Sequence, residues 1–340
     1  MNWKEVQDRA REKLTPVCKV CPNCNGVACR GQLPGMGGTG TGSSFINNYE
    51  ALAKYKFNLR TLHDVREPEL EVELFGRKLE LPLILGAVAG AKTNLNNSIS
   101  ENDLVESWLL GAQMSGILAM TGDGPDPSLY QTGIEGCKKY PGITIPVIKP
   151  RFPQEQILER IKWAEEAGAI AIGIDIDASA LIHRHMSGLV TETKTLAQIQ
   201  EIVNSTSLPV ILKGIMTVDE ALLAVEAGAK GIVVSNHGGR ALDHCPGTAD
   251  VLPAIAQAVR DKLTVLVDGG IRNGLDVLKV LALGAHGAVV GRPPSIAAVG
   301  GGAEGIKVMV DEFKFGLRRT MILTGTKDVK NVNPRILYRE

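Results

Sequence analysis

The sequence predicts an α/β fold, a (β/α)8 TIM barrel with an N-terminal helical and cysteine-rich extension. Short runs of β-branched and aliphatic residues recur along the chain, and each ends abruptly in polar residues and glycine. Segments with helical spacing separate these runs, which is typical of parallel strands joined by crossover helices. Eight such units favour a barrel over a doubly wound sheet, because the turn after the first strand, GAVAGAKTN, lacks the fingerprint GxGxxG.

The first part of the chain is expected to precede the barrel. Residues 2–14 have helical spacing and are followed by Pro16, which ends the helix. A cysteine-rich run comes next, and then a glycine-rich segment, residues 35–44, in which many positions can adopt a positive φ. We therefore expect an N-terminal extension over residues 1–46 and a barrel domain over residues 47–340.

The barrel domain is expected to begin with a helix over residues 47–57. Residues 69–82 then alternate in polarity around a turn at Phe75 and Gly76, which predicts a hairpin that closes the bottom of the barrel. The eight barrel strands are expected at residues 83–88, 116–120, 145–149, 170–176, 210–213, 231–235, 265–268 and 288–291. Residues 307–325 have helical spacing and should pack on the outside of the barrel.

Composition and charge argue against several classes of partner. The 37 basic and 37 acidic residues give a formal net charge of zero, and only 4% of the residues are aromatic. Neither value favours binding to nucleic acid or to an anionic membrane surface. The longest apolar run, residues 81–91, is too short to span a bilayer. The charged N-terminus is unlike a signal peptide, so a cytoplasmic location is expected.

Reactive side chains gather where the strands are expected to end. The carboxyl ends of barrel strands converge on one mouth, so the run VSNHGGR places Ser235, His237 and Arg240 there. His237 suits the role of a base, and Arg240 suits a substrate carboxylate. Alternatively, His237 caps a loop and Arg240 makes a structural ion pair, but the position at the mouth favours a functional role.

Three further strand ends point to an anionic cofactor. Lys213 ends the fifth strand, where a lysine is costly unless it faces an anion such as a reduced flavin ring. A glycine pair after strand seven and a Gly-Arg after strand eight are typical of a barrel phosphate site. Backbone N–H groups of Gly270, Gly291 and Arg292 would hold the phosphate, and Arg272 or Arg292 would add charge. The alternatives are a surface lysine and tight barrel turns.

The motifs SNHGGRALD and DGGIRNGLDV, with the later GRP, resemble the FMN-dependent α-hydroxy-acid dehydrogenase and oxidase family, whose members include glycolate oxidase and lactate oxidase. The resemblance covers most of the chain, from about residue 37 to residue 328. It implies His237 as catalytic base, Arg240 as carboxylate anchor and Asp175 as the residue that orients the histidine. It implies FMN contacts from Ala87, Val88, Ala89, Thr121, Lys213, Ser235, Asp268, Gly270, Arg272, Gly291 and Arg292.

The substrate side of the site departs from that family. A tyrosine is expected before the glycine-rich segment, where this chain has Pro-Gly-Met at residues 34–36. A second tyrosine is replaced by Lys149, which we take as a substrate-binding residue suited to a more anionic acid. The family's second arginine falls in the run ASALIHRHMSG, which offers only His183, Arg184 and His185.

Four cysteines precede the glycine-rich segment with the spacing C-x2-C-x2-C-x4-C: Cys18, Cys21, Cys24 and Cys29. The opening resembles a ferredoxin ligand run, although the last spacing is four rather than three. Four thiolates can also hold zinc, or the thiols can be metal-free. An iron–sulfur cluster here would pass electrons from FMN to a carrier. Cys137 and Cys245 are expected to be structural.

The leading hypothesis is an FMN enzyme that oxidises a small 2-hydroxy acid to the 2-oxo acid, with oxygen or a redox carrier as electron acceptor. A related FMN barrel, type 2 isopentenyl diphosphate isomerase, is one alternative. It is disfavoured because a diphosphate alkene does not need the pair His237 and Arg240. A flavin and thiol redox sensor without turnover is the other alternative. A homo-oligomer, a tetramer by analogy with the family, is expected.

Overall fold

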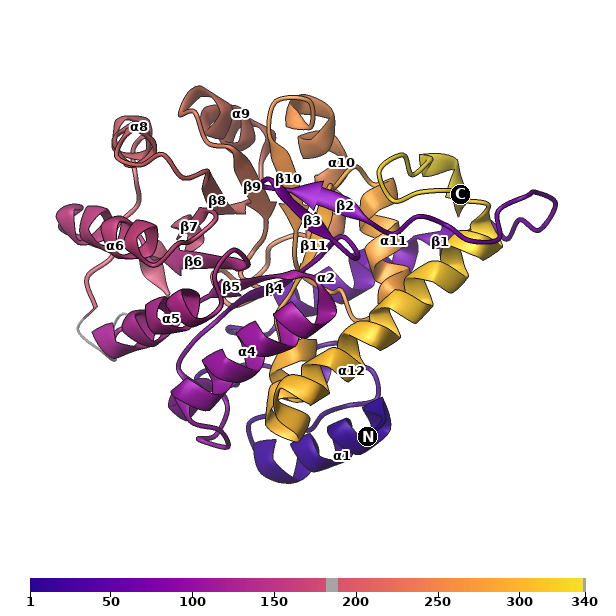
Figure 1. Cartoon of the computed structure of the whole chain (residues 1–340), viewed down its shortest axis with the longest axis horizontal. Helices are drawn as coiled ribbons and strands as arrows, with labels where there is room; N and C mark the ends of the chain where they lie inside the picture. The colour runs from indigo at the N-terminus through magenta and orange to yellow at the C-terminus, as the bar shows by residue number, and fades with distance from the viewer. Residues whose placement is uncertain (182–188, 339–340) are drawn as a thin grey trace.

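A closed barrel of eight parallel strands forms the centre of the molecule (Figure 1). The computed structural model describes residues 1–181 and 189–338. Around the barrel the strands follow the order β10-β11-β4-β5-β6-β7-β8-β9, so the chain winds once round with each strand beside the next. Their bounds are β4 Leu83–Val88, β5 Leu118–Thr121, β6 Thr144–Ile148, β7 Ile172–Asp175, β8 Val210–Ile215, β9 Gly231–Val234, β10 Thr264–Val267 and β11 Gly287–Val290. The predicted fold class is confirmed.

Helices surround this barrel, as the ring of ribbons in Figure 1 shows. Their bounds are α3 Ala91–Asn94, α4 Glu101–Ser115, α5 Pro127–Lys139, α6 Glu155–Glu166, α8 Leu196–Asn204, α9 Val218–Glu226, α10 Thr248–Val259, α11 Gly274–Ala282 and α12 Arg292–Thr324. Side chains cap several of them at the N-terminus: Asp126, Thr195, Thr217 and Asn273 each accept a backbone N–H of the first turn. No described helix combines the length and the apolar character that crossing a membrane requires.

Strand boundaries differ from the expected ones by one or two residues, for local reasons. Gly116, expected to start the second strand, instead ends α4 with a φ of 62°, the left-handed conformation that glycine adopts readily. Ile176, expected to end the fourth strand, begins the 3-10 helix η2 Ile176–Ala180. Gly291, expected to end the eighth strand, is the N-cap of α12. The expected helix over residues 47–57 is shifted: α2 spans Ser43–Lys54, and β1 Lys56–Phe57 pairs with β12 Leu337–Tyr338.

The predicted hairpin is present and lies against the amino-terminal end of the barrel (Figure 1). It consists of β2 Val72–Leu74 and β3 Arg77–Leu79, joined by Phe75 and Gly76. Both turn residues have positive φ, 51° and 72°, as a two-residue type I′ turn requires. The Phe75 ring lies so close to Gly231, the first residue of β9, that a Cβ added to that glycine would be 3.2 Å from Cζ. The ring therefore reaches the bottom of the barrel.

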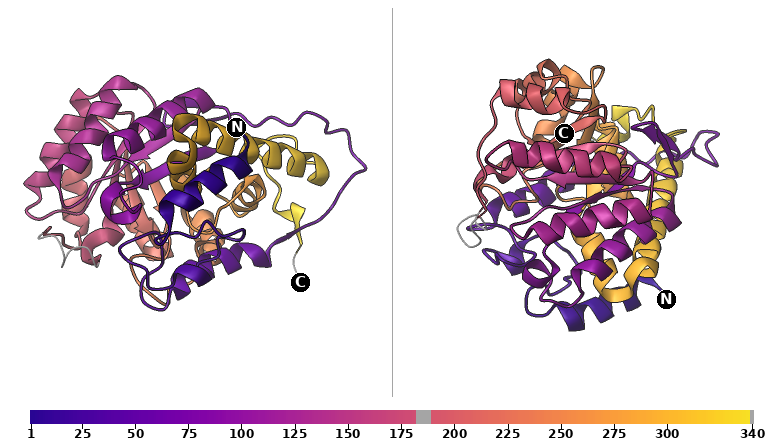
Figure 2. Two further views of the ribbon diagram at one scale, coloured as in Figure 1. Left: turned by 90° about the horizontal axis from the view of Figure 1, so that it is seen from below. Right: turned by 60° about the vertical axis from the view of Figure 1, so that its left-hand side comes forward.

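The N-terminal extension lies beside the last helix of the chain (Figure 2). Helix α1, Trp3–Leu14, buries Val6, Ala10 and Leu14 and packs on α12. Asn2 caps α1 through a capping box with Glu5. The 3-10 helix η1, Val27–Cys29, follows within the cysteine-rich run, and a second short one, η3 Pro334–Ile336, lies near the C-terminus. Helix α12 also packs on α4 and α11, which confirms the expected outer position of the C-terminal helix.

Candidate active site

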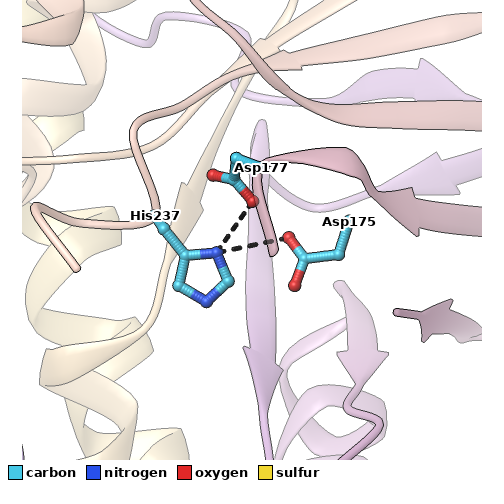
Figure 3. Close-up of side chains that lie close together, drawn as sticks. All are labelled: Asp175, Asp177 and His237. Atoms are coloured by element: carbon cyan, nitrogen blue, oxygen red, sulfur yellow. Dashed lines mark hydrogen bonds and ion pairs between the residues drawn. The ribbon is translucent and has the colours of Figure 1, made fainter. Parts of the chain in front are cut away.

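His237 lies in the loop after β9 and points toward two aspartates at the end of β7 (Figure 3). Its Nδ1 atom is 2.9 Å from Asp177 Oδ1 and 3.4 Å from Asp175 Oδ1. The His237 backbone adopts a φ of 60°, and its N–H donates to Ser235 Oγ at 3.0 Å. The described residues offer Nε2 no hydrogen-bond partner. The ring is thus held through one nitrogen while the other is free to exchange a proton.

Asp175 is a buried carboxylate between two lysines. Its Oδ1 atom is 2.9 Å from Lys213 Nζ, and its Oδ2 atom is 2.5 Å from Lys149 Nζ. Burial opposes ionisation, but the charges of His237, Lys149 and Lys213 outweigh it and hold the pKa of Asp175 well below its ordinary value. The residue therefore remains a carboxylate at neutral pH and stabilises positive charge on the imidazole.

Lys213 is almost fully buried at the end of β8, as a functional lysine in the mouth should be. Burial alone would lower its pKa, but Asp175, Asp177 and Asp268 outweigh burial and raise the pKa of the lysine. Its Nζ atom lies 3.9 Å from Asp268 Oδ2, which also accepts a hydrogen bond from Ser235 Oγ at 2.8 Å. The ammonium group remains charged in the floor of the mouth.

A metal ion could use some of these atoms as well, because one atom each of Asp175, Asp177 and His237 lie within 4.8 Å of one another. Both oxygens of Asp175 already contact lysine ammonium groups. A cation placed there would meet two positive charges. The arrangement favours proton chemistry at the imidazole over metal binding.

Arg240 and Arg292 bring positive charge to the mouth without an acidic partner. Arg240 donates to Gly35 O at 2.5 Å and to Asn94 Oδ1 at 3.0 Å, and Arg292 donates to Met36 O at 2.9 Å. No carboxylate in residues 1–181 or 189–338 forms an ion pair with either guanidinium. Burial, with the charge of Arg292, lowers the pKa of Arg240 to about 9, and burial with the charge of Arg272 lowers that of Arg292 to about 10. Two crowded cations of this kind bind anions.

The predicted phosphate site lies at the start of α12. Gly291 is its N-cap, and because Pro293 and Pro294 in the first turn have no N–H, the backbone donors left there are those of Gly291 and Arg292. Arg272 donates through Nε to Cys24 O at 3.0 Å and through Nη1 to Ile271 O at 2.9 Å, while its buried Nη2 atom has no partner. A buried N–H of a guanidinium without an acceptor is costly unless a ligand supplies one.

Other buried polar atoms around the mouth also lack partners, which fits an FMN group. They are Thr121 Oγ1, Asp177 Oδ2 and Asp268 Oδ1. Thr121 pairs with Val88 across β4 and β5, so the expected flavin-facing run Ala87 to Ala89 lies beside it. Unsatisfied donors and acceptors at the positions expected for the ring and the phosphate suit a polar, anionic cofactor.

All predicted mouth residues therefore lie at the carboxyl ends of strands, but two contacts were not foreseen. Asp177 makes the shorter contact to His237, and the signal was present, because the run GIDID contains a second carboxylate. Phe45, from α2, lies under Arg292 with its ring centroid 3.7 Å from the guanidinium carbon. No sequence pattern indicated this contact. His183, Arg184 and His185, which stand near the position of the family's second arginine, lie outside the described residues.

The cysteines predicted as metal ligands also come together. Cys18, Cys21, Cys24 and Cys29 line one small cavity, and none of them forms a disulfide. Arg292 and Phe45 line the same cavity. The cysteine-rich run is thus adjacent to the mouth.

Comparisons with known proteins give one consistent result. The family model described as FMN-dependent dehydrogenase matches residues 35–187 and 146–339. The 2-hydroxyacid oxidase of Dictyostelium discoideum is 28% identical over 333 residues, which cover 87% of this chain and 82% of that protein. Glycolate oxidase 3 of Arabidopsis thaliana is 27% identical and covers 84% of this chain and 85% of its own length.

Solved structures of mandelate oxidase share the fold. The complex with 3,3-difluoro-2-hydroxy-3-phenylpropionic acid has a TM-score of 0.80 at 28% identity and covers 100% of this chain and 98% of that one. A mandelate oxidase mutant with a monooxide FMN adduct has a TM-score of 0.76 at 31% identity, covering 90% of this chain and 94% of that one.

Proposed function

Because this chain belongs to the FMN-dependent dehydrogenase family, we propose that it binds FMN across the barrel mouth and oxidises a small 2-hydroxy acid to the 2-oxo acid. One observation carries the proposal. An imidazole fixed through Nδ1 and a guanidinium without an acidic partner lie at the same mouth, on His237 and Arg240. A 2-hydroxy acid brings a proton to lose and a carboxylate to bind, one for each group.

FMN, when bound, supplies the acceptor for the two electrons that leave the substrate. Arg240 holds the substrate carboxylate and thereby fixes the carbon that is oxidised. His237 takes the departing proton at Nε2, because Nδ1 is committed to the aspartates. Asp175 and Asp177 favour this transfer, since their negative charges stabilise the imidazolium that forms. Lys213 lies buried at the same mouth, positioned to face the flavin.

The phosphate of FMN would be held at the start of α12. Gly270 and Gly291 would contribute backbone N–H groups, and Arg272 and Arg292 would contribute charge. The unpartnered Nη2 atom of Arg272 supports this assignment, because a phosphate oxygen would satisfy it. Ala87, Val88, Ala89, Thr121, Ser235 and Asp268 would line the ring and its side chain.

Lys149 is proposed as a substrate residue as well as a partner of Asp175. Its ammonium group is partly exposed at the end of β6, where it can face a second anionic group of the substrate. Charge reversal in Lys149→Glu should then lower kcat/KM for dicarboxylic 2-hydroxy acids more than for monocarboxylic ones. Equal activity on all carboxylate substrates would contradict this role.

Five further proposals complete the assignment. We propose a reducing, cytoplasmic location, which suits six free cysteines. We propose oxygen or a redox carrier as the electron acceptor and a homo-oligomer as the working form. We retain residues 1–46 as an extension to the barrel domain 47–340. We also propose that Cys18, Cys21, Cys24 and Cys29 hold a metal centre, either an iron–sulfur cluster or zinc.

Anaerobic mixing of the purified protein with a panel of 2-hydroxy acids tests the function. At least one acid should bleach the flavin absorbance rapidly. The variant His237→Gln should bind FMN normally. Its flavin should be reduced by the substrate roughly 10²- to 10⁴-fold more slowly, because the variant lacks the proton acceptor.

The outcomes separate the competing functions. Bleaching only by a chemical reductant would favour a redox sensor. A colourless protein that does not take up FMN would overturn the assignment. The isomerase alternative predicts turnover of isopentenyl diphosphate, for which the pair His237 and Arg240 has no use.

A further inference from the structure

The cysteine cavity is built from the N-terminal extension and the start of α12. Its walls are mostly apolar, with Val20, Met36, Phe45 and Ile296 beside the four cysteines. Two cationic side chains, Lys19 and Arg292, line it as well. Four thiols thus converge in a mostly apolar enclosure, and none of the described cysteines forms a disulfide.

The turn that follows Cys18 is fixed by several contacts. The N–H of Val20 donates to Cys18 Sγ at 3.4 Å, so the sulfur is already oriented by the backbone. Val20 adopts a φ of 43°, an unfavourable conformation for a β-branched residue. Arg11 on α1 fixes the turn by donating to Lys19 O at 3.3 Å and Val20 O at 3.0 Å. Local strain that the surroundings impose in this way is typical of functional sites.

The spacing of the sulfur atoms distinguishes between the two candidate metal centres, zinc and an iron–sulfur cluster. A single zinc ion with Zn–S bonds of about 2.3 Å requires sulfur atoms roughly 3.8 Å apart. Within the described chain, no three of these cysteine sulfurs lie within 4.8 Å of one another. A cubane cluster binds each cysteine to a different iron, so its ligand sulfurs stand farther apart. The opening C-x2-C-x2-C is also the ferredoxin spacing.

We propose that Cys18, Cys21, Cys24 and Cys29 bind a [4Fe–4S] cluster that takes electrons from the FMN of this enzyme. Arg292 connects the two sites: it lines the cysteine cavity, and its Nη1 atom would lie 2.7 Å from a Cβ added to Gly238, the neighbour of His237. This electron route rests on the proposed oxidation of a 2-hydroxy acid. That oxidation releases two electrons and two protons. The cluster takes the electrons singly and passes each to a one-electron carrier protein, while the protons leave through His237 and solvent.

The test uses the full-length protein purified without oxygen. Analysis should find about four iron and four sulfide per chain, with absorbance beyond that of the flavin. Anaerobic titration should consume about 1.5 equivalents of 2-hydroxy acid per chain, because the flavin takes two electrons and the cluster one. The variant Cys21→Ser should contain at least tenfold less iron than the parent and should keep its FMN. It should consume about one equivalent of 2-hydroxy acid per chain. The matched control Cys245→Ser, at a cysteine away from the cavity, should behave as the parent does.

Each other outcome decides a separate point. Zinc in place of iron, or the absence of both metals, would overturn the cluster. Iron that survives in both Cys21→Ser and Cys18→Ser would overturn the ligand assignment. A titration that ends at one equivalent in the iron-containing parent would overturn the electron route. If the protein contains its full iron but no 2-hydroxy acid reduces its flavin, the proposed function is contradicted. The assignment of the cluster is unaffected by that result.

Discussion

His237 illustrates how single contacts set the chemistry of the mouth. The residue is held in a left-handed backbone conformation and is followed by two glycines, Gly238 and Gly239, that also adopt positive φ. This turn directs Nδ1 at Asp175, the last residue of β7, and at Asp177 in η2. The orientation of the ring therefore depends on carboxylates from a segment remote in the chain. Asp177, the nearer one, acts through the histidine and is a positioning residue.

The variant Asp177→Asn should slow flavin reduction by roughly 10²-fold while leaving FMN binding intact, since it removes the nearer charge that stabilises the imidazolium. Asp177→Glu keeps the charge and should restore much of the rate that Asp177→Asn loses. Asp261→Asn, an exposed aspartate on the surface, is the matched control. A slow Asp177→Asn enzyme that Asp177→Glu does not improve on would mean that the charge of Asp177 is not what matters.

Lys149 should affect how the activity of the enzyme falls at acid pH. The pKa of Asp175 is depressed by three cations, and Lys149 is one of them. The activity that needs the Asp175 carboxylate is present above that pKa and is lost as the pH falls through it. Lys149→Met removes one cation and raises the pKa, so activity should be lost at a higher pH than in the parent. Rate measurements across the acid range test this, and an unchanged acid limb would contradict it.

At the scale of elements, the hairpin of β2 and β3 has a turn residue that is chosen by its packing and not by the preference of the turn type. Type I′ turns favour Asn-Gly because both residues need positive φ, yet this chain has Phe75 at the first position. The ring compensates by packing against Gly231 at the bottom of the barrel. A glycine at that strand start leaves room for the ring, so the two positions depend on each other.

Phe75→Asn should therefore destabilise the protein even though it improves the turn. Loss of the half-buried ring should cost about 1–3 kcal/mol of the free energy of unfolding. Lys78→Ala, on the exposed side of the same hairpin, should change it by less than about 0.5 kcal/mol. Chemical denaturation of both variants tests the difference. Equal stability of Phe75→Asn and the parent would show that the ring does not close the barrel.

On the scale of the whole molecule, the N-terminal extension depends on one close helix contact. A Cβ added to Gly300 in α12 would lie 2.1 Å from the Val6 carbonyl oxygen of α1. The next glycine, Gly301, would meet only the flexible end of Met1, at 2.6 Å. Small residues thus let the two backbones approach, and this contact holds the cysteine cavity beside the mouth.

Gly300→Ala should separate α1 from α12 and loosen the extension, because backbone cannot yield as a side chain can. We expect faster proteolysis of the first 46 residues and weaker FMN retention. Gly301→Ala is the matched control and should be close to neutral, since the flexible end of Met1 can move away from the added methyl group. Limited proteolysis and FMN dissociation measure both effects. Identical behaviour of the two variants would refute the role of this contact.

Most of the fold could be predicted because its signals are local. Each barrel strand is a short aliphatic run, and each helix has its own periodicity and cap, so neither depends on distant partners. The shifted α2 and the pair β1 and β12 could not be predicted, because residues 56–57 form a strand only where the C-terminal residues reach them. Likewise, α12 consists of two helical segments, because Gly302 between them has a non-helical φ of 60° and ψ of −146°, and the expected stretch over residues 307–325 matches the second segment.

The candidate site divides in the same way. The sequence by itself determined which residues reach the mouth, since His237, Arg240 and Lys213 follow strands whose ends must converge in a barrel. Only the tertiary structure decided how they are paired: Asp177 as the nearer carboxylate, Lys149 on Asp175, and the cysteine cavity against Arg292. The physical reason is that strand position follows from local pattern, whereas hydrogen bonds and ion pairs depend on distances between segments remote in the chain.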